Sequence, residues 1–477
     1  MISNKNKPLK ILFASAEAAP FAKTGGLGDV GGSLPKALAE LGHDVSVVIP
    51  YYRSVRDAGH DIRPAVLRVY HPLTGWTSRF NVHMTAFGSL KVYFIENSWY
   101  FGRRGIYGQP SWGYPDNALR FGFFSKAVTA FQESAALDPD IIHSNDWHTA
   151  IIPYYLRNAR LRKRPGTLFT IHNAAYQGSC SRIFSKILGV KVEAYGKMNF
   201  MKAGILYADA VNTVSKKYAE EIKTSELGCG LETFIAKRGD SFSGILNGAD
   251  YGKWDPATDN LIGTNYCSST LEKKTECKKE ILCHTGLVTG TDKPLLGFIG
   301  RLVIQKGVDK LAEALDGIIK LGAGVVILGE GDIRYAAAFK AAEARYPGRV
   351  KLFNEFNESL AHRIEAGSDI FLMPSMFEPC GLNQIYSLKY GTIPVVHATG
   401  GLDDVIIDAD DEGENGNGFK FGLFTAADFL SAITRAVHKY HGDGAWRGLM
   451  KRAMACDFSW DRSAREYVEV YRSILNK

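Results

Sequence analysis

Residues 9–49 read LKILFASAEAAPFAKTGGLGDVGGSLPKALAELGHDVSVVI, and this stretch decides the fold class. The apolar run at residues 9–14 predicts a buried strand, and residues 30–41 carry apolar side chains at helical spacing. Residues 45–49 are rich in valine and predict a second buried strand. A strand, a helix and a strand in this order form a βαβ unit with parallel strands. The segment therefore predicts an α/β fold in which helices cover a parallel sheet.

The same alternation continues through the first half of the chain and starts again in the second half. Further strands of the first half are predicted at residues 92–95, 141–143, 168–171, 211–214 and 243–246. A polar stretch then predicts mostly helix over residues 247–291. Strands return at residues 295–299, 325–328, 350–353, 370–373 and 394–396. The two series predict two doubly wound, Rossmann-like domains that face each other across a cleft.

Chain length also predicts more than one domain. A single hydrophobic core rarely supports 477 residues. The junction is expected near residues 247–259, where Gly248, Gly252 and Pro256 interrupt the pattern. The predicted parts are residues 1–246, residues 247–459 and a final helix over residues 460–477.

Composition excludes several classes of protein. A net charge of +7 without a basic cluster argues against nucleic-acid binding. No run of 18 apolar residues and no apolar segment near the start predicts a membrane span or a signal peptide, so the expected location is the cytoplasm. Seven cysteines without a CxxC pair predict reduced thiols and no zinc site. Lysines and glutamates at helical spacing between Glu272 and Glu280 predict a solvated helix face, with Lys273, Lys274, Lys278 and Lys279 as its cations.

The glycine-rich loop before the first helix is a candidate anion site. Residues 23–29 read KTGGLGD, and the amides of Gly25 and Gly26 can approach an anion beside Lys23 and Asp29. A purely structural tight turn is the alternative. The loop also matches a dinucleotide fingerprint from Gly26 to Gly31, but the first strand ends well before it and no acidic residue follows the second strand. A dehydrogenase is therefore not expected.

Two loops of the second half carry further candidate residues. Residues 300–307 read GRLVIQKG, and Arg301 and Lys306 could bind a diphosphate without a metal; two solvated helix-capping cations are the alternative. Residues 374–382 read PSMFEPCGL, where Glu378 could bind sugar hydroxyls while the amides of Gly381 and Leu382 approach a phosphate. Cys380 considered alone is predicted to be a small buried residue rather than a reactive one.

Polar residues also follow two strands of the first half, in HSNDWH at residues 143–148 and IHNAAYQG at residues 171–178. Such residues project toward the carboxyl edge of a parallel sheet, where ligands bind. A histidine at a strand end is more often structural, and His143 and His148 lack a third metal ligand. No metal is expected.

Two further segments have competing interpretations. The acidic loop at residues 408–413 suggests a calcium loop, but Phe419 stands where the bidentate glutamate is required, which favours a solvated loop. Aromatic and charged residues at positions 99–117 could either stack on sugar rings or pack under a long loop. The candidate acceptor residues among them are Tyr100, Arg103, Tyr107, Asp116 and Asn117.

Six of these segments together resemble the bacterial glycogen and plant starch synthases, which are retaining glycosyltransferases. They are KTGGLGDV, HSNDWHT, TIHNAAYQG, ILNGAD, GRLVIQKG and PSMFEPCGL, in the order and approximate spacing of that family. The resemblance runs from Leu9 to about Trp460. It implies the GT-B fold, an acceptor-binding first domain, a nucleotide-sugar-binding second domain, and a last helix that crosses back to the first domain.

The resemblance also implies roles for individual residues. Donor phosphates would meet Lys23, the amides of Gly25 and Gly26, Arg301 and Lys306. Glucose would be surrounded by Asp146, His172, Asn247 and Glu378, beside the backbone of residues 380–382. The implied catalytic residues are Glu378, His172, Arg301 and Lys306, and Asp29 also belongs to the implied donor site.

The implied reaction moves glucose from ADP-glucose to a glycogen or other α-1,4-glucan chain with retention of configuration, without a cofactor. Related transferases carry a second glutamate eight positions after the first; Tyr386 stands there, as in the glycogen and starch synthase branch. Phe356 aligns with the aromatic residue that stacks on adenine. Met376 and Asn383 depart from the common pattern. A relative that uses UDP-glucose or a small acceptor is the alternative.

Overall fold

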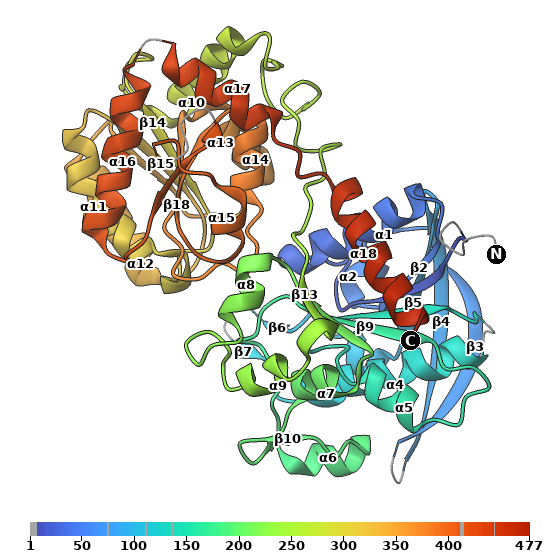
Figure 1. The fold of residues 1–477 in the computed structure, drawn as a ribbon. Helices are drawn as coiled ribbons and strands as arrows, with labels where there is room; N and C mark the ends of the chain where they lie inside the picture. Colours follow the sequence, from blue (N-terminus) through green and yellow to red (C-terminus); the bar gives the residue numbers. More distant parts are fainter. Residues whose placement is uncertain (1–6, 74–75, 110–111, 135–136, 411–414, 443) are drawn as a thin grey trace. The chain divides into compact units, whose positions relative to one another are not determined.

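The computed structural model describes residues 7–73, 76–109, 112–134, 137–410, 415–442 and 444–477. The chain forms two compact units (Figure 1). Unit 1 consists of Met1–Gly248 and Trp460–Lys477, and unit 2 of Ala249–Ser459. Each unit is built on a sheet of mainly or wholly parallel strands with helices packed on it, so the predicted fold class is confirmed.

Unit 1 contains a nine-stranded sheet in the order β13-β12-β9-β8-β1-β2-β5-β4-β3. Its strands are β1 (Lys10–Ala14), β2 (Asp44–Pro50), β3 (Arg63–Leu73), β4 (Trp76–Phe87), β5 (Leu90–Glu96), β8 (Ile141–Asn145), β9 (Gly166–Ile171), β12 (Ala210–Thr213) and β13 (Phe242–Gly244). The strands from β13 to β5 pair in parallel, whereas β4 pairs antiparallel with both β5 and β3. The antiparallel pair was not predicted from the sequence.

Two short hairpins and a set of helices complete unit 1. The hairpins pair β6 (Gly108–Gln109) with β7 (Trp112–Gly113), and β10 (Glu193–Ala194) with β11 (Lys197–Met198). The helices are α1 (Gly26–Glu40), α2 (Arg53–Asp57), α3 (Ser98–Phe101), α4 (Asn117–Ser134), α5 (Ile152–Asn158), α6 (Arg182–Leu188), α7 (Phe200–Tyr207), α8 (Lys216–Glu221), α9 (Glu232–Ala236), the short η2 (Gly239–Ser241) and α18 (Trp460–Leu475).

The last helix, α18, packs against α1 and β9 of unit 1 (Figure 1). Its inner face repeats at helical spacing and buries two tyrosines completely. Tyr471 OH lies 2.8 Å from His143 Nδ1, and Tyr467 OH accepts from Asn212 Nδ2 at 3.2 Å. His143 Nε2 lies 2.6 Å from Thr170 Oγ1. The two ring nitrogens of His143 are therefore used by α18 and by β9, in agreement with a structural histidine.

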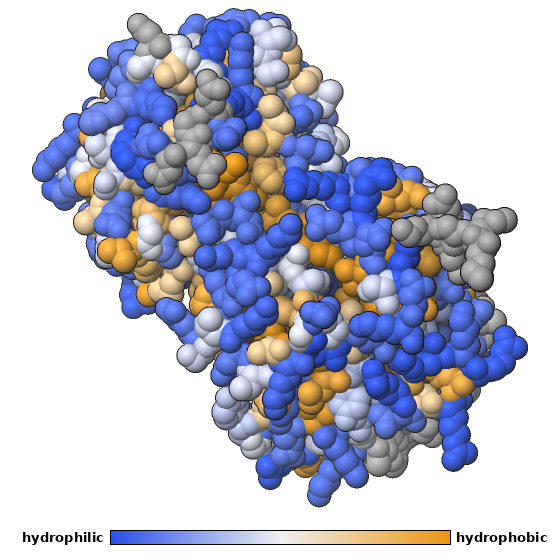
Figure 2. Space-filling view, viewed as in Figure 1, coloured by the Kyte–Doolittle hydropathy of each residue, from blue (hydrophilic) through white to orange (hydrophobic). Residues whose placement is uncertain are grey.

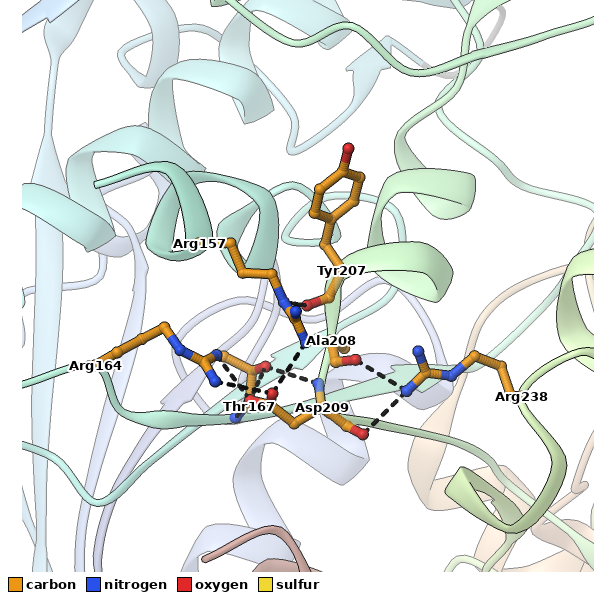
Figure 3. Close-up of polar contacts among 7 residues, drawn as sticks. All are labelled: Arg157, Arg164, Thr167, Tyr207, Ala208, Asp209 and Arg238. Atoms are coloured by element: carbon orange, nitrogen blue, oxygen red, sulfur yellow. Dashed lines mark hydrogen bonds and ion pairs between the residues drawn. The ribbon is translucent and has the colours of Figure 1, made fainter. Parts of the chain in front are cut away.

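Asp209, the residue before β12, ties the ends of several elements together (Figure 3). Its carboxylate accepts both guanidinium nitrogens of Arg164 at 3.0 Å and one of Arg157 at 3.1 Å. Thr167 in β9 donates its amide and its hydroxyl to the same carboxylate. Arg238 donates to the carbonyls of Ala208 and Asp209. One half-buried carboxylate thus joins the start of β9, the end of α5 and the start of β12.

Unit 2 contains a six-stranded parallel sheet in the order β16-β15-β14-β17-β18-β19. The strands are β14 (Leu295–Ile299), β15 (Gly324–Leu328), β16 (Val350–Phe353), β17 (Ile370–Met373), β18 (Ile393–His397) and β19 (Phe419–Phe421). β15 and β17 are buried along their whole length, because helices cover both faces of a parallel sheet. Five of the six strands were predicted; the three-residue β19 was not.

The helices of unit 2 begin with η3 (Leu271–Lys273) and α10 (Lys274–Thr285), followed by η4 (Ile304–Lys306), α11 (Val308–Lys320), α12 (Ile333–Arg345), α13 (Glu358–Gly367), α14 (Asn383–Lys389), α15 (Gly400–Val405), α16 (Ala426–Tyr440) and α17 (Ala445–Ala455). The predicted helix-rich stretch over residues 247–291 is wrong, because only residues 271–285 of it are helical. Turns that cap their own backbone, at Asp250, Asp255 and Asp259, compete with helix in the preceding residues.

The prediction of a solvated lysine face between Glu272 and Glu280 is wrong for two of its four lysines. Lys274 and Lys278 are buried, whereas Lys279 is exposed and pairs with Glu276. Lys274 Nζ donates to Thr392 Oγ1 at 2.7 Å and to the Ala366 carbonyl at 2.8 Å. Lys278 Nζ pairs with Asp369 at 2.6 Å. Tertiary partners compensate for the loss of hydration of the two ammonium groups.

Polar and charged side chains cover most of the face drawn in Figure 2. Among the described residues, no helix is long and apolar enough to cross a membrane. All seven cysteines are free thiols.

Candidate active site

The glycine-rich loop of unit 1 leads into α1, whose first turn has no side-chain cap. Lys23 Nζ pairs with Asp29 Oδ1 at 2.7 Å beside this turn. A side chain added at Gly25 or Gly26 would meet no described atom within 4 Å, so the loop backbone borders open space. The uncapped amides and the neighbouring ammonium group give this loop the character of an anion site.

Two glycines that follow this loop, in α1, have a packing role. A Cβ atom at Gly31 would lie 2.2 Å from the Glu17 carbonyl, and one at Gly32 would lie 2.6 Å from the Ala19 carbonyl. The backbone between β1 and the loop therefore runs against α1 at a distance that only glycine permits. This close approach accounts for Gly31 without a dinucleotide.

Glu17 connects the glycine-rich loop to the aromatic segment, and the sequence interpretation missed it. Its buried carboxylate accepts from the amide of Thr24 at 2.5 Å and from its hydroxyl at 2.8 Å. Tyr107 OH donates to the same carboxylate at 2.5 Å. Tyr107 in turn stacks on His148, with ring centroids 4.9 Å apart. Glu17 lies outside the predicted strand and helix, and its contact with Tyr107 is distant in sequence, so no local pattern indicated that it is buried.

Asp146 follows β8 and adopts a left-handed backbone conformation, φ 59°. The side chain is buried, and its Oδ1 atom has no hydrogen-bond partner in the described part of the chain. Burial raises the pKa of Asp146 to about 7, although the amides of His172 and Asn173 oppose the shift. A strained residue with an unused buried acceptor at a strand end is suited to accept a hydrogen bond from a ligand.

His172 follows β9 and lies beside Asp146. Its Nε2 atom lies 3.0 Å from Asn145 Oδ1, and Asn145 Nδ2 donates to the Ala14 carbonyl. Because the amide orientation of Asn145 is set by that carbonyl, His172 Nε2 carries the proton and Nδ1 is an acceptor. Burial lowers the pKa of His172 to about 3, so the ring is neutral at pH 7. Asn247 is also buried, and its Oδ1 lacks a partner among the described atoms.

The candidate acceptor residues form a braced loop in unit 1. Arg103 holds Asp116 through two bonds of 2.7 and 2.8 Å. Arg120, fully buried and missed in the sequence, donates to the Tyr100 and Ile106 carbonyls and to Asn117 Oδ1. Asn117 Nδ2 donates to the Tyr107 carbonyl. The Arg120 amide donates to the Asp116 carbonyl, so the five residues lie in one network. Trp99, in the same segment, is 76% exposed.

In unit 2, the two predicted loops are joined by their side chains. Lys306 Nζ donates to Glu378 Oε2 and forms an ion pair with it. Ser375 Oγ donates to the same oxygen at 3.1 Å, a contact that the sequence did not reveal. Glu378 is buried, so this carboxylate is held in place by a cation and a hydroxyl. Arg301 is exposed at the start of the first loop.

Backbone contacts hold the same two loops together. The Met376 amide donates to the Gln305 carbonyl at 2.9 Å. Gly307, at φ 67°, lies so close to Pro374 that a Cβ atom would be 1.7 Å from its carbonyl oxygen. Gly400 and Gly401 approach the Glu378 and Cys380 carbonyls in the same way. The Glu378 loop is thus fixed from two sides by glycine contacts.

The remaining predicted residues of unit 2 differ in exposure. Cys380 is buried, and Gln384 Nε2 donates to the Cys380 and Gly381 carbonyls. Phe356 is 80% exposed and available for stacking. The buried ring of Tyr386 stacks on Trp254, with centroids 4.1 Å apart and an interplanar angle of 3°. The ring face of Tyr386 is therefore occupied by Trp254.

The described part of the acidic loop is held by hydrogen bonds within unit 2. Asp408 is buried and accepts two bonds from Arg435 and one from the Lys420 amide. Residues 411–413 of this predicted loop lie outside the described residues. In the part of the chain that the structure describes, no group of three or more His, Cys, Asp or Glu residues could hold a metal ion.

Comparison with known proteins decides the family. The model of the starch synthase catalytic domain matches residues 10–237, and that of glycosyl transferases group 1 matches residues 285–443. A glycogen synthase of Geotalea uraniireducens is 42% identical over 98% of this chain and 99% of its own length. A glycogen synthase of Anaeromyxobacter sp. is 44% identical, again over 98% and 99%. This chain belongs to the glycogen and starch synthase family. It is therefore a glycosyltransferase.

Solved structures agree with this family assignment. The catalytic domain of starch synthase IV from Arabidopsis thaliana, bound to ADP and acarbose, is 33% identical and superimposes with a TM-score of 0.91. The match covers 99% of this chain and 100% of that one. A sucrose-phosphate synthase from Thermosynechococcus elongatus shares the fold at a TM-score of 0.62 and 17% identity. The family fold is GT-B, in agreement with the sequence prediction.

Proposed function

We propose that this family member elongates α-1,4-glucan, with ADP-glucose as the donor and retention of the anomeric configuration. The observation that carries the proposal is the Lys306–Glu378 pair with Arg301 at the start of the same loop. A buried, doubly held carboxylate can orient sugar hydroxyls, and two cations can stabilise a diphosphate leaving group. The structure of the Arabidopsis starch synthase was solved with ADP and acarbose, which supports an ADP-linked donor and a glucan-like acceptor.

We assign the residues of unit 1 to the donor and the glucose as follows. Lys23 and the amides of Gly25 and Gly26 bind donor phosphate, and Asp29, which pairs with Lys23, belongs to the same donor site. Asp146, His172 and Asn247 bind the transferred glucose through the acceptor atoms described above. The network of Tyr100, Arg103, Tyr107, Asp116 and Asn117 binds the acceptor glucan.

In unit 2, Arg301 and Lys306 stabilise the negative charge that develops on the departing diphosphate. The leaving group takes the proton of the attacking hydroxyl on the same face, so the mechanism requires neither a protein nucleophile nor a metal or cofactor. Phe356 and Tyr386 belong to the nucleotide side of the site, beside the backbone of Cys380, Gly381 and Leu382. The proposed location of the enzyme is the cytoplasm.

The test is an initial-rate assay with glycogen and either ADP-glucose or UDP-glucose, in which nucleotide release and radiolabelled polymer are followed together. Labelled polymer with a strong preference for ADP-glucose is the expected result. Nucleotide release without polymer would indicate a small acceptor, and equal or better use of UDP-glucose would contradict the donor assignment. Absence of both nucleotide release and labelled polymer with either donor would contradict the proposed activity.

A further inference from the structure

His397, the last residue of β18, makes an unusual pair of contacts in unit 2. Its Nδ1 atom lies 2.8 Å from the Ser375 carbonyl oxygen, and its Nε2 atom lies 3.2 Å from the Gly422 carbonyl oxygen. A carbonyl oxygen can only accept a hydrogen bond. A neutral imidazole has one N–H and would direct the lone pair of its other nitrogen at a carbonyl. Only the imidazolium form can donate to both oxygens.

We propose that His397 is a positioning residue that acts as an imidazolium and holds the Glu378 loop in its active geometry. The proton of one ring nitrogen bonds the loop at Ser375, and the proton of the other bonds the backbone just after β19. This inference rests on the proposed function, because it concerns the same carboxylate.

The connection from His397 to Glu378 is short. Ser375, whose carbonyl accepts from His397, donates its own hydroxyl to Glu378 Oε2 at 3.1 Å. The next residue, Met376, is tied through its amide to the Gln305 carbonyl. Loss of the His397 contact would remove the hydrogen bond that orients the Ser375 carbonyl, while the Gln305 and Gly307 contacts remain. The expected effect is a misplaced carboxylate rather than an unfolded loop.

Charged groups on the elements that pack against β18, and beside Phe424, have partners of their own. On the neighbouring β19, Lys420 pairs with Asp403 of α15 at 2.9 Å, and Asp428 of α16 accepts from the Leu423 amide. Lys310 of α11 lies over the ring of Phe424 and pairs with Asp309 and Glu313. Lys389 of α14 pairs with Asp255, Arg452 of α17 donates to the Gly416 carbonyl, and Glu378 pairs with Lys306.

Two aromatic rings complete the surroundings of His397. The Phe421 and Phe424 centroids lie 5.2 and 5.3 Å from that of His397. The two carbonyl oxygens are the described groups within hydrogen-bond distance of the ring nitrogens. Protonation of His397 and the position of Ser375 are therefore coupled.

The experiment compares the wild type with His397→Arg and His397→Gln in glucan-transfer assays between about pH 6 and pH 9, around the range where histidine titrates. Arginine stays cationic and retains several donors, whereas glutamine is neutral. The wild type should lose kcat on the alkaline side. His397→Arg should lack this alkaline loss. His397→Gln should have a kcat that does not change across this pH range and lies about 5- to 30-fold below the wild-type value at the acidic end, because it misplaces a reacting group. The exposed His438→Gln is the matched control and should keep the wild-type profile.

A second measurement does not depend on activity. In protein labelled with ¹⁵N-histidine, the ring signals of His397 are identified by their absence in His397→Gln, and their shifts report whether the ring is an imidazolium. An imidazolium at pH 7 is expected. A neutral ring at pH 7, or a His397→Gln variant with wild-type kcat and an unchanged alkaline limb, would overturn the inference. Absence of any transfer by the wild type with an imidazolium signal would contradict the proposed function and leave the state of His397 established.

Discussion

Asp146 lowers the stability of the fold and at the same time offers an acceptor atom for a ligand. Its side chain is buried, one oxygen lacks a partner in the described residues, and its pKa is raised from the ordinary 3.8 to about 7. A carboxyl group with a raised folded-state pKa stabilises the fold at low pH, and this contribution is lost as the pH rises toward that value. Asp146 therefore makes the fold less stable at pH 8 than at pH 4.

Asp146→Asn should raise the free energy of unfolding at pH 8 and lower transfer activity. Asparagine tolerates the left-handed backbone and carries no charge, so the gain should be on the order of 2 kcal/mol at pH 8 and should shrink toward pH 4. Urea unfolding at both pH values measures it. Asp240→Asn, an exposed change in the same unit, should show no such trend. A gain that does not vary with pH would contradict the raised pKa.

Glu378 and Lys306 form one ion pair, but replacing each of them by alanine should change different kinetic constants. Glu378→Ala removes the group that orients glucose and should lower kcat about 10² to 10³ fold. Lys306→Ala should chiefly raise the KM for the donor and slow transfer, because it removes charge beside the diphosphate. Steady-state kinetics with both substrates varied separate the two effects. Lys279→Ala, which breaks a surface pair on α10, is the control, and near-normal kinetics in both site variants would contradict the proposed site.

At the scale of elements, Asp209 joins α5 to the starts of β9 and β12, through the contacts drawn in Figure 3. Burial alone would raise the pKa of Asp209, but bonds from Arg164 and Thr167 lower it below its ordinary value. A lowered pKa means that this carboxylate stabilises unit 1 at neutral pH and that the contribution is lost as the pH falls through the folded-state pKa.

Asp209→Asn should therefore destabilise unit 1 at pH 7 by roughly 2–4 kcal/mol, since it leaves two partly exposed arginines without their carboxylate. The difference from the wild type should decrease below about pH 4, where the wild-type carboxylate also becomes neutral. Denaturant unfolding at the two pH values tests this. Asp61→Asn breaks a fully exposed arginine pair and should leave the unfolding curve unchanged. Equal effects of the two variants would argue against a structural role for Asp209.

Elements also show where sequence patterns succeed and fail. Fully buried parallel strands such as β15 read as continuous apolar runs, and the buried positions of α11 (Val308, Leu311, Leu315) repeat at helical spacing, so both were predicted. Lys274 and Lys278 have the same local pattern as Lys279, yet they are buried. Their partners Thr392 and Asp369 lie about a hundred residues away, and helical spacing carries no information about them.

At the scale of the whole molecule, the two ends of the chain meet in one unit. α18 follows unit 2 in the sequence but belongs to unit 1, where Trp460, Tyr467 and Tyr471 are buried. A chain that ends at Ser459 should lose this packing, because several large side chains would leave cavities and an exposed apolar face.

We expect the truncated chain to show a lowered unfolding temperature for unit 1 and an unchanged transition for unit 2, measured by calorimetry and limited proteolysis. Tyr471→Phe, which removes only the contact to His143, should cost about 1 kcal/mol in unit 1. Glu469→Ala, at an exposed position of the same helix, should have no effect. A truncated chain with both transitions unchanged would show that α18 contributes nothing to unit 1.

The sequence by itself determined the α/β class, most of the strands and the loops after them, because hydrophobic period and glycine-rich turns are local properties. It also indicated the family, because six short motifs occur in the order and approximate spacing of that family. Only the tertiary structure decided the buried charges of Lys274 and Lys278, the Glu17–Tyr107 contact, the bracing role of Arg120 and the double contact of His397. Each of these depends on a partner far along the chain, and the free energy of burying a polar group is set by that partner rather than by its neighbours in sequence.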